Sequence, residues 1–193
     1  MKSPVLQPGD IVGVKNSRWN PIAWISEYCT YPHSPYYHFL MVGYWRGNNW
    51  TIYESIGKGV AIGFLDFYKG KEVIVYRIFA TEEFDAEWIG RQVTDRMPRY
   101  GRGSYDYLLP VKLIAGALKV WSCQLLHLHL PTALRPASLP YTKDSRYICT
   151  ELAVQPFADI GHAIVPPGVV PIPASIKEAQ LRGRVTIVWE GQL

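Results

Sequence analysis

The chain has 193 residues, of which 48% are hydrophobic and 19% are charged, so residues 1–193 can bury the core of a single domain and disorder is not expected. The net charge is +4, and the basic residues are scattered except for a short run, "MPRYGRG" at 97–103. A nucleic-acid-binding surface is normally more densely basic, so we expect no nucleic-acid partner.

The first ten residues, "MKSPVLQPGD", lack the apolar core of a secretory signal. We therefore expect a cytoplasmic protein, or one that is delivered outside as part of a virion or a secretion machine. A Pro-Gly turn then leads into a strand that ends near Lys15. A short helix is predicted over 19–28, where Asn20 is a candidate N-cap and Pro21 suits the first helical position.

Strands rich in branched and aromatic residues follow, and the turns between them contain glycine, which predicts an antiparallel meander. The predicted strands cover residues 34–44, 50–56, 59–65 and 71–78. A helix over 81–97 comes next, with Thr81 as its cap and with acidic residues in its first turn that suit the helix dipole.

The last part of the chain combines helices with proline-rich loops. A helix is predicted to begin near Cys149, and a second short helix, capped at or near Ser175, leads to a closing strand over 184–190. Strands that are followed by helices predict an α+β fold. We expect a small antiparallel sheet or partial barrel that packs against the helix carrying Cys149.

An apolar stretch at 107–130 is long enough to cross a membrane, but polar residues interrupt it. Lys112, Lys119 and Gln124 would lie in hydrocarbon, at a cost of a few kcal/mol each. We therefore predict a buried or half-buried helix followed by a short extended piece. Contact with a membrane surface is the lesser alternative.

Cys149 is the candidate nucleophile. Apolar residues recur on one helical face from Ile148 to Ile160 and a polar segment precedes them, so Cys149 should lie in the first turn. Free backbone N–H groups there lower the pKa of a thiol and can bind an oxyanion during acyl transfer. Pro156 should bend or end this helix. The same pattern also fits a packed helix cysteine, which is the more common case.

A thiol nucleophile needs a base, and five histidines are available. His38 lies inside a convincing strand, "YYHFLMVGY", which would hold an imidazole more firmly than a loop does. Glu54, at the end of the next strand, could orient the imidazole. Direct opposition of His38 and Glu54 requires a three-residue turn with Gly47 in the left-handed conformation, and a one-residue slip would put Glu54 on the wrong face. Each residue, taken alone, would more commonly be structural.

Other candidates are weaker. His127 and His129 would share one face of an extended segment, as metal ligands can, but no third ligand is close in sequence. We therefore expect no metal and no other cofactor. Cys29 is a rival nucleophile, but it follows a helix end, where the dipole disfavours a thiolate. Cys123 has apolar neighbours and is interpreted as a core thiol.

The order of the motifs resembles that of a known family. The segments "GDIV", "YYHFLMVGY", "YESIGKGVAIGFLDF", "SYDYLL" and "YICTEL" occur in the order typical of the YiiX/YebB-like, circularly permuted members of the NlpC-type papain-like cysteine hydrolases. In this permuted group the histidine strand precedes the cysteine helix. The resemblance covers residues 8–190 and implies a permuted papain-like fold, with Cys149 as nucleophile, His38 as base and Glu54 as orienting acid.

The chain also departs from the family pattern. Thr150 stands where a serine usually follows the cysteine. The 42 residues between "YD" and the cysteine form a longer gap than usual, which suggests an apolar insertion at about 107–140. Asp106 of the "YD" pair should be structural, for instance as the cap of the helix that follows.

The resemblance implies thiol-dependent hydrolysis of an amide bond, in a cell-wall-type peptide or an N-acyl amino substrate. A second hypothesis is a lipid-linked acyltransferase or thioesterase of the lecithin–retinol acyltransferase-like type, in which the stretch 107–130 would contact a membrane. A third hypothesis is a non-catalytic papain-like module of a larger assembly, such as a phage particle or a secretion machine.

Overall fold

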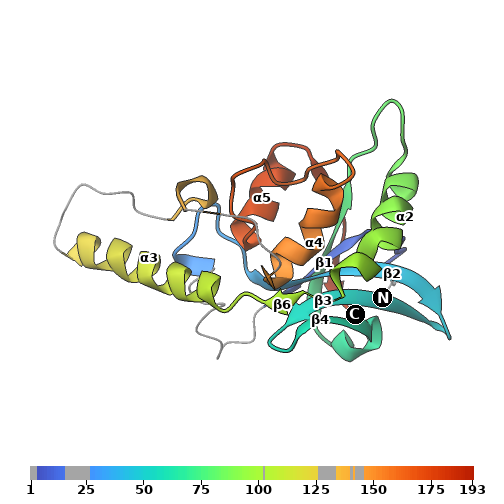
Figure 1. The fold of residues 1–193 in the computed structure, drawn as a ribbon, viewed down its shortest axis with the longest axis horizontal. Coiled ribbons are helices and arrows are strands. Elements are labelled where there is room, and N and C mark those ends of the chain that lie inside the picture. The colour runs from blue at the N-terminus through green and yellow to red at the C-terminus, as the bar shows by residue number, and fades with distance from the viewer. Residues whose placement is uncertain (1–3, 16–26, 102, 126–133, 140, 142–145) are drawn as a thin grey trace.

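Six antiparallel strands form the central sheet of the protein, in the order β4-β3-β2-β1-β5-β8 (Figure 1). The computed structural model describes residues 4–15, 27–101, 103–125, 134–139, 141 and 146–193, and the structural statements below concern these residues. The strands are β1 (Ile11–Lys15), β2 (Tyr36–Arg46), β3 (Asn49–Ile56), β4 (Gly59–Phe64), β5 (Glu72–Ile78) and β8 (Val185–Gln192). They confirm the predicted strands, including the closing one, and β1 to β4 form an antiparallel meander. The last strand of the predicted meander, β5, pairs instead with β1 and β8.

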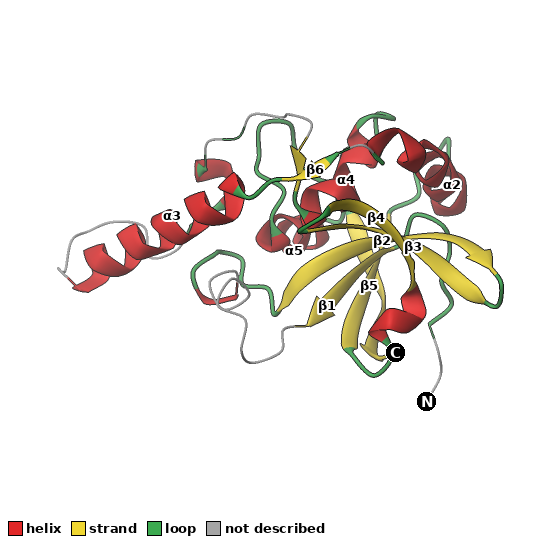
Figure 2. Ribbon diagram, turned by 60° about the horizontal axis from the view of Figure 1, so that its bottom comes forward, coloured by secondary structure: helices red, strands yellow, loops and turns green. Residues whose placement is uncertain are grey.

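Three helices pack on one face of this sheet (Figure 2). They are α2 (Ala86–Arg96), α4 (Cys149–Ala158) and α5 (Pro173–Leu181). Because side chains alternate along a strand, Phe39 faces Leu152 in the core beneath the helices, whereas Leu40 joins a second apolar cluster on the opposite face. The 3-10 helix η1 (Leu65–Tyr68) contributes Leu65 to that second cluster. The protein is therefore α+β, as predicted.

The start of α2 differs from the prediction. Asp85, rather than Thr81, is the N-cap, because Asp85 Oδ1 accepts a hydrogen bond from the Trp88 N–H at 2.6 Å. Thr81 instead closes a turn before the helix, in which its hydroxyl oxygen accepts from the Phe84 N–H at 3.0 Å. Both residues have the short oxygen-bearing side chain that a cap requires, so residue type alone does not distinguish them.

The predicted boundaries of α4 and α5 are closer to the structure. In α4, Pro156 lies inside the last turn and the helix ends two residues later at Ala158. In α5, Ser175 occupies the third helical position, and its hydroxyl oxygen accepts a hydrogen bond from the Ile172 N–H at 3.1 Å. Ser175 therefore takes part in capping without being the N-cap itself.

The apolar stretch forms a helix, α3 (Leu108–Leu125), that projects from the body of the protein (Figures 1 and 2). Up to Ser122, Leu109 and Ala117 are buried and the other residues are partly buried or exposed, so the helix is half-buried, which is one of the two predicted alternatives. No helix among the described residues is long and apolar enough to cross a membrane. The extended piece predicted after α3, and most of the helix predicted at 19–28, lie outside the described residues.

A buried ion pair joins the N-terminal turn to β5. Arg77 donates two hydrogen bonds to Asp10, from Nε to Oδ1 and from Nη2 to Oδ2, both at 2.8 Å. The Gln7 N–H also donates to Oδ2, at 2.9 Å. Burial raises the pKa of Asp10, while the hydrogen bonds from Arg77 and Gln7 oppose that rise. The Asp10 carboxylate therefore depends on Arg77 to compensate its charge.

Replacing Arg77 with methionine should lower the free energy of unfolding by about 3–5 kcal/mol, because it leaves a buried carboxylate without its cation. Denaturation in guanidinium chloride measures the change. Arg91→Met is the matched control, since Arg91 pairs with Glu87 on the exposed surface of α2 and its loss should have little effect. Equal effects of the two substitutions would contradict a structural role for the buried pair.

Candidate active site

His38 is held in β2 beside an irregularity of the strand. Val14 of β1 pairs with His38, whereas the next residue, Lys15, pairs with Tyr36, so Tyr37 is an extra residue in β2. Such a β-bulge redirects neighbouring side chains and is common beside active sites. His38 shares its face with Val14, on the side of the second apolar cluster. The prediction that a strand holds His38 is confirmed.

The hairpin between β2 and β3 is tighter than predicted. It closes through Gly47 and Asn48, whose φ angles are both positive, at 55° and 66°. Two successive positive φ values are the pattern of a type I′ turn with a two-residue loop. The three-residue turn that direct opposition of His38 and Glu54 would require is therefore not formed, and the direct partner of Glu54 is Leu40.

A second β-bulge puts Glu54 on the same face as His38. Gly43 and Tyr44 of β2 lie together opposite Thr51 of β3. Without this extra residue, Glu54 would be displaced by one position and would point to the other face of the sheet. Gly43 is suited to the bulge because a Cβ atom there would lie 2.4 Å from Thr51 Oγ1. Glu54 thus becomes a diagonal neighbour of His38 across the two strands.

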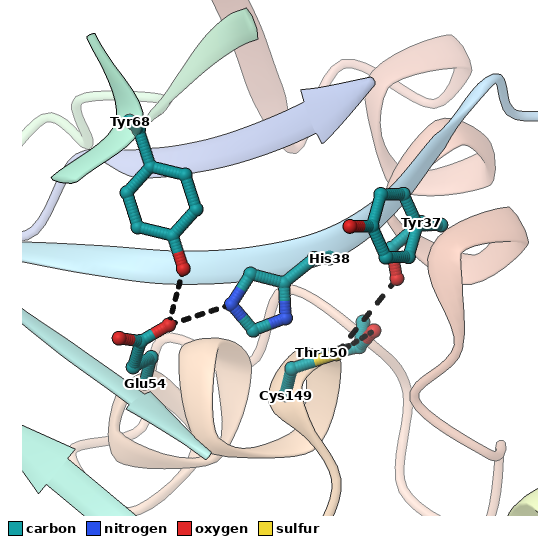
Figure 3. A network of polar contacts seen from close by, with 6 residues as sticks. All are labelled: Tyr37, His38, Glu54, Tyr68, Cys149 and Thr150. Carbon is teal, nitrogen blue, oxygen red and sulfur yellow. Dashed lines mark hydrogen bonds and ion pairs between the residues drawn. The ribbon is translucent and has the colours of Figure 1, made fainter. Parts of the chain in front are cut away.

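Glu54 joins His38 to Tyr68 of η1 through one carboxylate oxygen (Figure 3). Glu54 Oε2 accepts hydrogen bonds from His38 Nε2 at 2.7 Å and from the Tyr68 hydroxyl at 2.5 Å. Burial alone would raise the pKa of Glu54, but the hydrogen bonds from His38 and Tyr68 hold it below its ordinary value. An ionised carboxylate can only accept hydrogen bonds, so the proton of this bond belongs to His38 Nε2.

Cys149 is the first residue of α4, and its sulfur lies on the side of the His38 ring away from Glu54 (Figure 3). The pairing of β2 with β3 begins only after Phe39, so the edge of β2 before that point is available to the start of α4. There the Cys149 thiol donates to the Tyr37 carbonyl oxygen at 3.8 Å. The Phe39 amide also helps to lower the pKa of the cysteine thiol. The strands β1, β2 and β3 and the helix α4 thus meet at the Cys149 sulfur and the His38 imidazole.

The surroundings of Cys149 favour a thiolate. Burial alone would raise the pKa of the Cys149 thiol, but the hydrogen bond to His38, the charge of the ring and the Phe39 amide hold it below its ordinary value. Burial alone would likewise lower the pKa of His38, but its interactions with Cys149 and Glu54 raise it to about 10. Between these two pKa values the pair exists as thiolate and imidazolium.

The rival thiol, Cys29, has a different environment. Cys29 is half-buried, and burial raises the pKa of its thiol. Nearby His33 is an exposed residue whose Nδ1 forms a hydrogen bond with the Glu27 carbonyl at 2.8 Å. This agrees with the prediction that Cys29 is the less suitable nucleophile. The Cys123 side chain lies outside the described part of the chain.

No metal centre is formed within the part of the chain that the structure describes, since no three His, Cys, Asp or Glu side chains there could hold an ion together. His127 and His129, which the sequence analysis considered as weak candidates for metal ligands, lie outside the described residues.

Tyr68 is a site residue that the sequence analysis missed. Its ring stacks over the His38 ring with a centroid separation of 6.0 Å and an interplanar angle of 22°. Burial and the hydrogen bond to Glu54 both raise the pKa of Tyr68, so it remains a neutral donor. Its position depends on η1 folding back over β2, and "DFYKG" carries no local signal of that contact.

The "SYDYLL" segment lies beside the cysteine. β6 (Ser104–Tyr105) pairs in parallel with β7 (Arg146–Tyr147), immediately before Cys149. Burial and the charge of Cys149 raise the pKa of Tyr105 to about 12. Asp106 Oδ1 accepts hydrogen bonds from the first two N–H groups of α3, at 2.8 and 3.3 Å, so its predicted role as a helix cap is confirmed.

A cavity of about 260 Å³ adjoins the site. Tyr37 and Tyr68 form the wall nearest the imidazole. The remaining wall is made by β1 and the start of β5, where Lys15 forms an ion pair with Glu72 at 2.7 Å. Neither His38 nor Cys149 is among the residues that line this space, which therefore adjoins the site only through the two tyrosines.

Comparison with known proteins assigns no family to the chain. A scan against protein-family models finds no match, and a search of the curated proteins finds no match either. The site must therefore be interpreted from its own geometry.

Alkylation by iodoacetamide should distinguish the two thiols, because only a thiolate reacts. Cys149 should react at a pH below the ordinary pKa of a thiol, since its pKa is lowered, whereas Cys29 should need a higher pH, since its pKa is raised. Mass spectrometry of peptides alkylated across a pH series measures both rates in one sample. If the two rates rise over the same pH range, Cys149 is not activated.

Replacing Glu54 with glutamine should slow this alkylation by about tenfold at neutral pH, because loss of the negative charge lowers the pKa of His38 and lets the pKa of Cys149 rise by about one unit. Glu72→Gln is the matched control, since Glu72 is an exposed carboxylate whose ion pair lies on the far wall of the cavity. An unchanged rate in Glu54→Gln, with native circular dichroism, would exclude a role of Glu54 in setting the charge of the pair.

Proposed function

We propose that this protein is a cysteine-dependent amide hydrolase, with Cys149 as nucleophile, His38 as general base and acid, and Glu54 as the group that orients the imidazole. The observation that supports this most directly is the position of the His38 ring. It binds Glu54 through Nε2 at 2.7 Å and turns its other nitrogen toward the sulfur at the start of a helix (Figure 3). That arrangement of nucleophile, base and orienting acid is the one that covalent acyl transfer requires.

The first half of the proposed reaction forms a thioester. The Cys149 thiolate attacks the carbonyl carbon of the amide, and the carbonyl oxygen becomes an oxyanion. Backbone N–H groups of the first turn of α4 have no partner within the helix and can stabilise this charge. The His38 imidazolium then gives the proton on Nδ1 to the leaving nitrogen, so the C–N bond breaks and an amine departs.

The second half releases the acyl group. His38 is now neutral, and Nδ1 takes a proton from a water molecule that attacks the thioester carbonyl carbon. Collapse of the second tetrahedral intermediate breaks the C–S bond and returns the thiolate and the imidazolium. Glu54 keeps the proton of His38 on Nε2 throughout, because its pKa is held low and it remains an acceptor.

The finer fold that accompanies this proposal is a permuted papain-like fold of the YiiX/YebB-like type. Two features support it. The histidine strand precedes the cysteine helix in the chain, and α4 packs against β2 and β3 with Cys149 at its first position. The substrate class implied by that resemblance is a cell-wall-type peptide or an N-acyl amino compound, and the cavity beside Tyr37 and Tyr68 has room for one side chain of such a molecule.

Replacing Cys149 with alanine should reduce amide hydrolysis of peptidoglycan fragments or N-acyl amino acids at least about 10³-fold, because no other group can form the thioester. Release of the amine, followed by mass spectrometry, measures the activity. Cys29→Ala should retain full activity. Wild-type activity in Cys149→Ala would remove Cys149 from the mechanism. An unreactive wild-type thiol would favour a non-catalytic module of a phage or secretion assembly.

A second candidate function is acyl transfer or thioester hydrolysis on a lipid-linked substrate. The observation that favours it is the exposed apolar helix α3, which begins three residues after Tyr105 at the site. The same Cys149–His38 pair would carry out this reaction, with an alcohol, an amine or water accepting the acyl group. Assay of acyl esters and acyl amides side by side with the wild-type protein distinguishes the two substrates.

A further inference from the structure

The outward side of α3 is apolar, although it faces solvent. Its exposed residues recur at three- and four-residue intervals, which places them on one side of the helix. Leu108, Val111, Leu118 and Trp121 are respectively 48%, 58%, 55% and 61% exposed. The opposite side packs inward through Leu109 and other residues of a small apolar cluster. We call the exposed set, completed by Lys112, Ala115 and Lys119, the outer face of α3.

Solvent is a poor environment for this outer face. Monomeric soluble proteins rarely expose contiguous apolar patches of this kind unless the patch binds something. The far half of α3 also has little support from the rest of the protein, since it projects from the body (Figures 1 and 2). Most of the stability of a helix in a protein comes from the packing of its apolar face. The outer face therefore needs a partner that accepts leucine, valine and tryptophan.

The charge of α3 indicates which partner this is. Lys112 and Lys119 are seven residues apart, so they lie on the same border of the outer face, and both are exposed. The helix contains no acidic residue, and the sequence has none from 107 to 143. Lysine that borders leucine and tryptophan side chains is typical of helices that lie in the surface of an anionic membrane, where the lysine side chains reach the headgroups.

We propose that the outer face of α3 docks on an anionic membrane surface, with the helix lying in the plane of the interface. Val111, Leu118 and Trp121 would enter the boundary between headgroups and acyl chains, and the two lysines would bind lipid phosphates. Because α3 begins beside Tyr105, this docking holds the Cys149 site at the membrane surface. The inference does not depend on the proposed chemistry, since it concerns binding alone.

Flotation with lipid vesicles tests the proposal. The wild-type protein should float with vesicles of phosphatidylcholine and phosphatidylglycerol mixed at about 3:1, and much less with phosphatidylcholine alone. Binding should also fall at about 1 M salt, where charge attraction is screened. The double substitution Lys112→Glu and Lys119→Glu should weaken binding to the anionic vesicles at least about tenfold. Leu118→Ser with Trp121→Ser should weaken binding to a similar extent or more.

Matched controls use the same substitutions elsewhere on the surface. Lys69→Glu with Lys71→Glu has the same change in net charge on exposed residues that follow η1. Ile62→Ser with Phe67→Ser removes two side chains that are 68% and 73% exposed. Both controls should float like the wild type, and circular dichroism should show all variants folded.

Two results would overturn the proposal. The first is wild-type protein that does not float with anionic vesicles, or that floats equally well after the α3 substitutions. The second is self-association, detected by light scattering, that the α3 substitutions abolish, because the outer face would then bind a second copy of the chain. Alkylation of Cys149 in the same variants gives a separate readout, so a failure of membrane binding is distinguishable from a failure of the proposed chemistry.

Discussion

The hydrogen bond between His38 Nε2 and Glu54 Oε2, at 2.7 Å, is the interaction on which the candidate site depends. It assigns the proton of His38 to one ring nitrogen and leaves the other for the sulfur. It also supplies part of the negative potential that keeps the imidazole charged. Tyr68 donates to the same oxygen at 2.5 Å, so the carboxylate is held from two directions and cannot turn away from the ring.

This hydrogen bond in turn depends on irregularities of β2. A regular hairpin closed by Gly47 and Asn48 would place Glu54 on the face occupied by the helices. The bulge at Gly43 changes the register by one residue and brings the carboxylate to the face of His38. The bulge at Tyr37 lies next to His38, at the edge where the start of α4 replaces β3. The deviations from a regular sheet are therefore what assemble the site.

Local sequence signals could predict the parts of the site that are set by local structure. The polar-to-apolar change before Cys149 placed it correctly in the first turn of a helix, and branched and aromatic residues placed His38 correctly in a strand. Glu54 was correctly predicted to contact His38, but that prediction assumed a register in which the two residues are directly opposite, which the structure does not have. A bulge depends on how Gly43 packs against Thr51 across the hairpin, and the sequence of either strand alone does not contain that contact.

Features set by distant contacts could not be predicted in the same way. Tyr68 reaches Glu54 because η1 folds over the sheet, and no sequence pattern within residues 65–68 predicts this contact. The prediction of Thr81 as the N-cap of α2 was wrong because Thr81 and Asp85, four residues apart, are both residue types that can cap a helix. The apolar stretch at 107–130 correctly predicted a helix, but hydropathy does not say whether an apolar side chain meets a protein core or the surface of the molecule.

The position of α3 in the chain explains how such an exposed helix is compatible with an ordered site. The parallel pairing of β6 with β7 holds the two ends of the segment that carries α3 together, and between them Leu134 and Tyr141 form hydrogen bonds with Cys29 and Glu151 of the body. The cost of closing a loop grows only slowly with its length, so the excursion changes the site little as long as this pairing holds. The return strand leads within two residues to Cys149. The β6–β7 pairing is therefore the contact that connects the start of α3 to Cys149.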